Sequence, residues 1–305
     1  MHWVRLGKIF APSGHEPWMR SHAAVPFAER VEGNNYAVYV SGRDAEGRSC
    51  TGILHVELEP TQRVIRVEPD ALLLPGAPGT FDDAGAMLSW IVQSGGDRYF
   101  YYVGWNRGQN VPFRNAVGLA IQKRGERVLK WGGFTGHTSV LDPGPHDPSF
   151  TASCCVLVES DVWRMWYVSG LGWTREDGRM EPRYHLKYAE SRDGIHWQRD
   201  GVVAIDFRHP SERAISRPCV VRDADTYRMW YSYRGERYAI GYAESADGLT
   251  WTRKDDVLGL SPSGVDWESD MVEYPHVFDH DGRRYMLYNG NGYGKSGLGL
   301  AVLRA

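Results

Sequence analysis

The sequence lacks the features that mark a membrane-spanning, secreted or disulfide-linked protein. None of its apolar runs approaches the length of about 20 residues that a transmembrane helix needs. Its first residues show no basic region followed by an apolar run, so we expect no signal peptide. The four cysteines, Cys50, Cys154, Cys155 and Cys219, follow neither disulfide nor zinc spacing, and the adjacent pair is typical of small buried strand residues. Together these absences predict a cytoplasmic protein.

An excess of charge of one sign is missing as well. The chain has 35 Lys and Arg against 38 Asp and Glu, a formal net charge of −3. Such a balance creates no overall field for nucleic acid or an anionic membrane, so we expect neither as a partner. No cluster of metal ligands stands out, and we expect no cofactor, although a central metal ion near His22 stays open. Long helical periodicity is also absent, which favours strands.

What the sequence does contain is an aromatic segment that recurs five times. Its copies have successive spacings of 63, 64, 64 and 58 residues, and their leading aromatics are Tyr36, Tyr99, Trp163, Tyr227 and Tyr285. Each copy is aromatic and β-branched, alternates in polarity and is closed by Gly, Ser or Asn, which is typical of a strand. Self-similarity at a long fixed period indicates stacked or radially arranged repeats.

Each repeat resolves into a pattern of four strands, and the two ends of the chain complement each other. The last unit stops after its third strand, while residues 3–10 match the fourth-strand pattern of residues 197–203. We therefore expect the N-terminal strand to complete the last blade and close a ring, which a β-sandwich, the alternative fold, would not require. The predicted fold is an all-β, five-bladed β-propeller forming a single domain, with blades at about 20–75, 80–140, 146–205, 212–262 and 266–305 plus 1–10.

The first strand of each propeller blade lines the central tunnel, so the segments that lead into those strands converge on one axis. Each of these five segments carries ionisable groups beside residues that should be interior: 20–26, 79–87, 146–151, 212–218 and 266–275. Burying such groups costs several kcal/mol, about 2–7 for a polar group alone, unless they are paired. Their coincidence at one place in the repeat indicates a functional site.

At this level of detail the chain resembles the superfamily of five-bladed glycoside hydrolases that contains families 43, 32, 68 and 130. The repeated Tyr-x-Met-Trp-Tyr and Ala-x-Ser-x-Asp-Gly-x-x-Trp elements carry the resemblance along the whole chain. It is closest to glycosidase-like proteins of that superfamily, some of which accompany bacterial surface-sugar biosynthesis. Glu273 matches the Glu-x-Pro element of those families, and Asp83 matches an inner-strand Asp. The first blade presents Ser21 and His22 where an Asp-Pro element is expected, and Asp147-Pro148 lies on the third blade.

The resemblance implies carboxylate acid/base chemistry. Glycosidic cleavage needs a protonated carboxylic acid at the leaving oxygen and a carboxylate that attacks or activates water. We expect Glu273 to be the acid, because the like charge of Asp270 and apolar neighbours would raise its pKa. Asp83 is then the base or nucleophile. Further residues are predicted to tune the acid or to contact the substrate, the tryptophans by stacking on sugar rings: Asp270, Glu268, His22, Arg217, Asp82, Asp147, Trp105 and Trp173.

Structural interpretations of the same residues remain open. Asp82, Asp83 and Asp147 could cap turns, and Glu268 and Asp270 could be solvated loop acids. His22 could be a satisfied core histidine, and Arg217 could pair with an inner carboxylate. The glycine-rich stretch 289–294 lacks the spacing of a phosphate loop, so we predict a turn or a loop that faces the substrate.

Two classes of function therefore follow from the sequence. The first is an enzyme acting on a glycosidic or activated-sugar linkage, with a small carbohydrate or sugar nucleotide as its ligand. The second is a carbohydrate-binding or scaffold propeller that has no turnover. A third possibility is different sugar chemistry on the same fold with His22 as the base, and its rate would rise near about pH 6–7.

Overall fold

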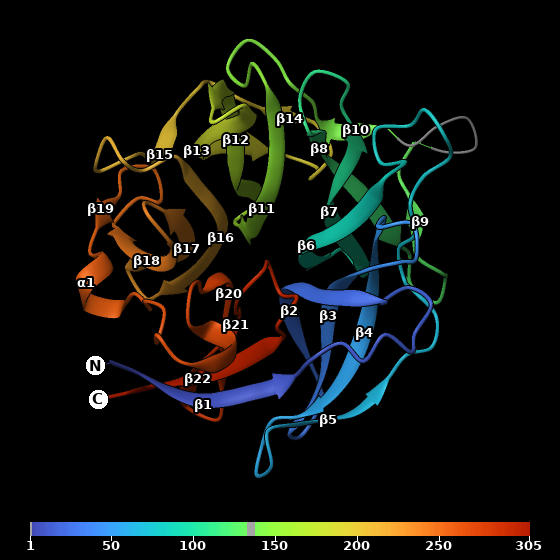
Figure 1. Cartoon of the computed structure of the whole chain (residues 1–305), viewed down its shortest axis with the longest axis vertical. Coiled ribbons are helices and arrows are strands. Elements are labelled where there is room, and N and C mark those ends of the chain that lie inside the picture. The colour runs from blue at the N-terminus through green and yellow to red at the C-terminus, as the bar shows by residue number, and fades with distance from the viewer. Residues whose placement is uncertain (1, 133–137) are drawn as a thin grey trace.

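A computed structural model describes residues 2–132 and 138–305 of the chain (Figure 1). Antiparallel strands, grouped in sheets around a central axis, make up most of it, as in a β-propeller. Within the described residues, the helical elements are one turn of α-helix, α1 (Asp255–Leu258), and a 3-10 turn, η2 (Asp266–Glu268). No helix in the described residues is long and apolar enough to cross a membrane.

The strands follow one another as antiparallel neighbours, group by group. The first group contains β2 (Ser21–Glu32), β3 (Asn35–Arg43), β4 (Ser49–Glu57) and β5 (Arg63–Val67). The next contains β6 (Gly85–Ser94), β7 (Asp97–Arg107), β8 (Phe113–Gln122), β9 (Leu129–Lys130) and β10 (Ser139–Leu141). The third contains β11 (Phe150–Glu159), β12 (Val162–Glu176), β13 (Arg179–Ser191), β14 (Trp197–Gln198) and β15 (Val203–Ile205).

The fourth group contains β16 (Ala214–Asp223), β17 (Thr226–Arg234), β18 (Tyr238–Ser245) and β19 (Thr252–Arg253). The last contains β20 (Glu273–His280), β21 (Arg283–Asn289) and β22 (Leu298–Arg304), together with β1 (His2–Phe10) from the other end of the chain. β1 pairs with β22 from His2 opposite Arg304 to Phe10 opposite Leu298. The two ends of the chain therefore lie side by side (Figure 1).

The recurring aromatic segments form the second strand of each group, as the sequence predicts: β3, β7, β12, β17 and β21. Their alternation directs large rings into the spaces between groups. Trp166 of β12 and Trp230 of β17 are completely buried, and Trp3 of β1 meets Trp230 edge-on with ring centroids 6.0 Å apart. Aromatic rings bury about 150–250 Å² each, so these contacts supply much of the core. Cys154 and Cys155 are buried on β11, which confirms their interpretation as small strand residues.

An acid, a tyrosine and a base recur as a unit that we call the latch. In the second group, Asp82 lies just before the inner strand β6 and is completely buried. It accepts a hydrogen bond from Tyr102 of β7 at 3.0 Å and another from Lys130 of the outermost strand β9 at 2.5 Å. The latch therefore ties the inner turn of the sheet to its outer edge through a charge-assisted hydrogen bond.

The same arrangement recurs in the third and last groups. Asp147, also completely buried, accepts from Tyr167 of β12 at 3.1 Å and from Arg199, just after β14, at 2.9 Å. Glu268 accepts from Tyr288 of β21 at 2.8 Å and forms an ion pair with Arg5 of β1 at 3.1 Å. In this last latch the base comes from the opposite end of the chain, so it fastens the N-terminal strand to the C-terminal group.

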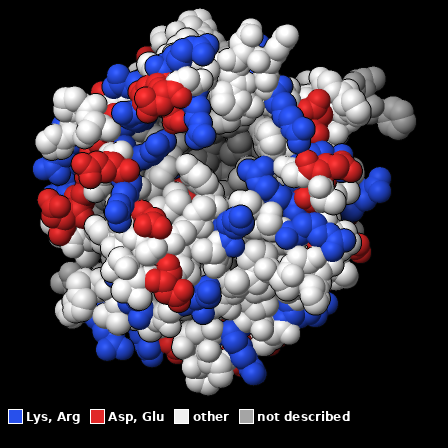
Figure 2. Space-filling model, viewed as in Figure 1, with Lys and Arg blue, Asp and Glu red and all other residues white. Residues whose placement is uncertain are grey.

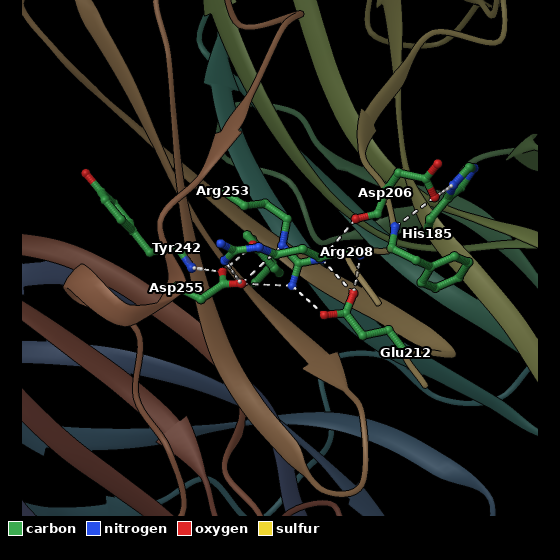
Figure 3. Close-up of polar contacts among 9 residues, drawn as sticks. His185, Asp206, Arg208, Glu212, Tyr242, Arg253 and Asp255 are labelled. Carbon is green, nitrogen blue, oxygen red and sulfur yellow. Dashed lines mark hydrogen bonds and ion pairs between the residues drawn. The ribbon is translucent and has the colours of Figure 1, made fainter. Parts of the chain in front are cut away.

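The fourth group uses a branched version of the latch (Figure 3). Arg253 of β19 donates to Glu212, before β16, at 2.6 Å and to Asp255 at 2.9 Å. The tyrosine of this group, Tyr231, donates to Asp255 at 2.5 Å instead of to the acid before the inner strand. In the first group, a tryptophan takes the place of the acid, tyrosine and base: the Trp18 indole N–H donates to the carbonyl of Glu68, just after β5, at 3.0 Å.

Each inner strand is interrupted near its start by a register shift of the kind that a β-bulge produces. Val25, Arg217 and Tyr274 lie at these shifts, precede prolines, and have φ angles of 54°, 51° and 56°. A side chain other than glycine in this left-handed region costs about 1–3 kcal/mol, and such strain gathers at functional sites. The bulges re-aim side chains at the start of the inner strands, where the axial cavity lies.

Candidate functional site

A cavity of about 450 Å³ opens at the axis and receives side chains from every group of strands. Figure 2 shows a hollow near the centre of the molecule, with Lys and Arg side chains gathered around it. Trp105, Phe113 and Phe150 give the cavity apolar walls. Its polar lining is mainly basic and phenolic, and its ionisable members are His22, Arg43, Glu181, Tyr184, Arg217, Arg234, Tyr238, Tyr274 and Tyr293.

Glu273, the first residue of β20, lies directly behind this lining and is completely buried. Neither of its carboxylate oxygens has a well-formed hydrogen bond to any described residue. Burial raises the pKa of Glu273 well above its usual range, and the adjacent Tyr274 phenol offsets this only in part. The raised pKa favours the protonated, neutral form of the carboxyl, which is the form that the sequence analysis expects for an acid. Of the two predicted causes, burial among apolar neighbours is confirmed, whereas the like charge of Asp270 does not contribute.

Four phenols line the cavity and interact electrostatically with Glu273: Tyr184, Tyr238, Tyr274 and Tyr293. For all of them, burial raises the pKa and the charge of Glu273 adds to the effect, which places the carboxyl within their shared neighbourhood. The Tyr184 and Tyr238 hydroxyls form a hydrogen bond at 2.9 Å. Tyr293, on the loop between β21 and β22, is 45% exposed and is the outermost of the four. That loop consists of turns and faces the cavity, as predicted for residues 289–294.

Glu181 supplies a second carboxylate at the cavity. It lies on β13 and forms an ion pair with Arg234 of β17 at 3.2 Å. The charges of Glu181 and Glu273 both raise the pKa of the Tyr293 phenol, so both carboxyls interact electrostatically with the same side chain. The sequence interpretation missed Glu181 because it lies outside the converging segments. The available signal was the unusually long β12–β13 hairpin, whose strands of 15 and 13 residues extend it over the cavity.

Arg217 forms the floor of the cavity and is completely buried. Its guanidinium donates to the Ser89 carbonyl of β6 at 2.5 Å and the Pro26 carbonyl of β2 at 2.7 Å. Its backbone N–H donates to the Ser153 hydroxyl of β11 at 3.1 Å. Arg217 thus joins its own strand, β16, to three other inner strands, and it forms no ion pair with a carboxylate in the described part of the chain.

A second cavity of about 460 Å³ is lined by later residues of the same inner strands, among them Phe27, Trp90 and His276. The first residues of these strands line the axial cavity, so the two cavities lie towards opposite ends of the strands. The Arg217 guanidinium lies 5.8 Å from the centre of the Trp90 ring, between them.

His22, Arg43 and Trp105 form one side of the axial cavity. His22 Nδ1 lies 2.8 Å from the Ser21 hydroxyl, and burial, with the positive charges of Arg43 and Lys295, lowers its pKa to about 4. His22 is therefore neutral at pH 7. The Arg43 guanidinium lies 5.5 Å from the centre of the Trp105 ring, a cation–π contact.

The other predicted acids lie away from the cavity lining. Asp83 sits in the turn before β6, where its carboxylate accepts the Gly79 backbone N–H at 2.9 Å, and the structure does not bring it together with Glu273 at the cavity. Asp82, Asp147 and Glu268 are the acids of three latches.

Two more predicted residues lie outside the lining. The Asp270 side chain is 74% exposed and lies 3.9 Å from Arg237. Trp173 packs edge-on against Phe113 behind the cavity wall, with ring centroids 4.9 Å apart. Of the predicted site residues, His22, Arg217 and Trp105 reach the cavity itself. In residues 2–132 and 138–305, no three or more His, Cys, Asp or Glu side chains are grouped to hold a metal ion.

Comparisons with known proteins agree with this fold. No protein-family profile matches the chain. Among solved structures, one described as a glycoside hydrolase superimposes with a TM-score of 0.75 at 17% identity, over 99% of this chain and 91% of that one. A thermostable family-43 glycoside hydrolase has a TM-score of 0.64 at 15% identity, over 96% and 92%. The predicted resemblance to propeller glycoside hydrolases is thereby confirmed for the fold.

Sequence comparison gives a nearer relative. The uncharacterized protein MT1551 of Mycobacterium tuberculosis (strain CDC 1551 / Oshkosh) is 45% identical over 305 residues, which covers 99% of each chain. Identity at this level over the whole length establishes common ancestry and a common fold. The chain belongs to the same family as this mycobacterial protein.

Proposed function

We propose that the protein is a five-bladed propeller that acts on a glycosidic or activated-sugar linkage in its axial cavity. The blade count is supported by five successive antiparallel groups, each with an inner strand, and by the pairing of β1 with β22. Neighbouring inner strands are in contact all the way round, since β2 contacts both β6 and β20, and β11 and β16 complete the series. Closure removes exposed sheet edges, as propellers require.

The observation that carries the proposed activity is the carboxyl of Glu273, which is buried behind the cavity lining and has no well-formed hydrogen bond within residues 2–132 and 138–305. An uncompensated acid in the interior costs stability, and perturbed acids of this kind are typical of catalytic sites. In this proposal Glu273 donates its proton to the leaving-group oxygen. Glu181 replaces Asp83 as the second carboxylate, because Glu181 faces the cavity whereas Asp83 caps a turn. A pair with one protonated and one ionised member is what glycosidic cleavage needs.

The aromatic walls fit a carbohydrate ligand. Trp105 and Phe113 present ring surface on which the apolar face of a sugar can pack, while the phenols and arginines offer hydrogen-bond donors to hydroxyls. Glu273 itself does not reach the surface of the cavity, so a substrate contacts it only after the covering phenols move. Tyr293 is the exposed phenol of the set and is the side chain we expect to move.

Turnover of a panel of aryl glycosides by the wild type and by Glu273→Gln, Glu181→Gln and Asp270→Asn tests the proposal. We expect the first two variants to lose a factor of about 10²–10⁴ in kcat/KM, the contribution of one acid–base group. Asp270→Asn is the matched control, because it removes an exposed acid three positions from Glu273. Equal loss in all three variants, or none in Glu273→Gln, would contradict the assignment. Thermal unfolding of each variant separates chemistry from folding.

The position of Glu273 behind the lining also favours a second function, sugar binding without turnover. A binding propeller needs the aromatic walls and the donors but no accessible acid. It would retain ligand affinity in Glu273→Gln and hydrolyse no glycoside, and calorimetric titration on the same variants distinguishes the two functions.

A further inference from the structure

More positively than negatively charged side chains line the axial cavity. Arg43, Arg217 and Arg234 all line it, against one lining carboxylate, Glu181. Arg234 is paired with that carboxylate at 3.2 Å. Arg43 and Arg217 make no ion pair with a carboxylate anywhere in the chain as described. Two guanidinium groups at the cavity therefore lack a counter-charge, in a protein whose overall charge is slightly negative.

Arg43 is the more available of these two groups. It ends β3, and its guanidinium makes one hydrogen bond among the described residues, from Nη1 to the Gly47 carbonyl at 3.0 Å. The Arg43 guanidinium also makes a cation–π contact with the Trp105 ring, whose centre is 5.5 Å away. A guanidinium presents five N–H donors in a rigid fork that matches the oxygens of a carboxylate or a phosphate. Most of that fork is unused by the protein.

Tyr274 lines the same cavity as Arg43 and Arg217. Its phenolic O–H is a hydrogen-bond donor, so it is available to an anion bound in that cavity. Arg217 keeps its Nε without a hydrogen-bond partner and is completely buried, so its charge is weakly screened at the cavity floor.

We infer that the cavity takes a sugar that carries an acidic group, a carboxylate or a phosphate, bound by the Arg43 fork and the Tyr274 hydroxyl above the Arg217 charge. This inference rests on the proposed function for the location of the sugar and deepens it by naming the class of substrate. Because Tyr274 directly follows Glu273, the acidic group lies beside the proposed proton donor. The neutral His22 ring, next to Arg43, adds no competing charge.

Isothermal titration of the intact protein with D-glucuronate, glucose 6-phosphate and D-glucose tests the inference. A hydrogen bond to a charged group contributes about 1.5–3 kcal/mol, so we expect at least one acidic sugar to bind about 10–100-fold more tightly than glucose. The preference should shrink when salt rises from about 0.05 to 0.5 M, because the cavity is open to solvent. This salt series uses the wild type alone and needs no variant to fold.

Three variants assign the preference to Arg43. Arg43→Gln should abolish the discrimination, and Arg43→Lys should keep part of it, since the charge remains but the fork is lost. Arg114→Gln is the matched control: Arg114 is an exposed arginine of β8 whose neighbours Phe113 and Asn115 line the cavity while it does not. We expect this control to leave the discrimination unchanged.

The outcomes separate the source of the acidic group and the two proposals. Tighter binding of glucuronate alone identifies a carboxylate, and tighter binding of glucose 6-phosphate alone identifies a phosphate. Equal binding of glucose, no binding of either acidic sugar at about 10 mM (a Kd that corresponds to less than about 3 kcal/mol), or discrimination that survives Arg43→Gln overturns the inference. Acid preference without any glycoside cleavage refutes the proposed catalysis alone. Cleavage of neutral glycosides that depends on Glu273, without acid preference, refutes this inference alone.

Discussion

Replacing Glu273 by Gln should change how the stability of the protein depends on pH. In the folded protein, burial raises the pKa of this carboxyl well above its usual range, whereas in the unfolded chain it titrates near about 4.3. Between these two values the folded chain holds a proton that the unfolded chain has released. The free energy of unfolding must therefore fall as pH rises from about 4.3 towards the folded pKa.

The size of the effect follows from the linkage relation. One proton held only in the folded state lowers the free energy of unfolding by about 1.4 kcal/mol for each pH unit, as long as pH stays below the folded pKa. From pH 5 to pH 7 the wild type should therefore lose up to about 3 kcal/mol through this group. Gln fills the same space without titrating, so the variant escapes this loss. Its stability relative to the wild type should rise across the same interval.

Urea unfolding of both proteins at pH 5, 6 and 7 measures the difference directly. Every other titrating group contributes to both proteins, so the pH dependence of the difference isolates Glu273. Asp270→Asn serves as the control, because its side chain is 74% exposed and its removal should give a difference that is flat with pH. A flat difference for Glu273→Gln as well would refute the protonated, buried state on which the proposed chemistry depends.

Two further predictions concern the last latch and the histidine of the cavity. Arg5→Met should lower the free energy of unfolding by about 1–3 kcal/mol, because Glu268 keeps a buried carboxylate without its cation. A double-mutant cycle with Glu268→Gln should show coupling between the two residues. Arg304→Met, on the paired strand, is the control and should lower the free energy of unfolding by less than about 0.5 kcal/mol. His22 has its pKa lowered to about 4, so its protonation favours the unfolded chain. The wild type should lose stability relative to His22→Asn as pH falls from about 6.5 towards 4, and ligand binding should show no step near pH 6.5 that this substitution removes.

Most of the fold could be predicted from the sequence because its signals are local. The aromatic segments alternate in polarity, and alternation determines which face of a strand is buried. The Asp-Gly turns are equally local: Gly194 and Gly248 have φ angles of 74° and 77°, and Asp193 and Asp247 accept two following backbone N–H groups each. Each of these features depends on a few consecutive residues.

Less of the site could be predicted, because the direction of its side chains depends on contacts with residues that are distant in the sequence. Asp82 and Asp83 are adjacent, yet one side chain turns inward to Lys130 and the other caps a turn, and residue type cannot distinguish the two directions. Arg217 lines the cavity as expected, but its protein partners are backbone carbonyls, which every residue possesses, and not the inner carboxylate that was the alternative. Glu181 reaches the cavity because the β12–β13 hairpin that carries it is unusually long. The Glu-x-Pro element located Glu273 because a proline fixes the bulge around it.

The position of Arg217 has a consequence for how ligands enter and leave the axial cavity. Its guanidinium reaches across the axis to carbonyls of β6 and β2, and the two cavities lie towards opposite ends of these inner strands. We therefore expect a bound molecule to enter and leave the axial cavity by the same mouth, without threading through the molecule. Under the proposed function, the free end of a polymer or a small saccharide is the part that would fit, and each product would leave before another molecule binds.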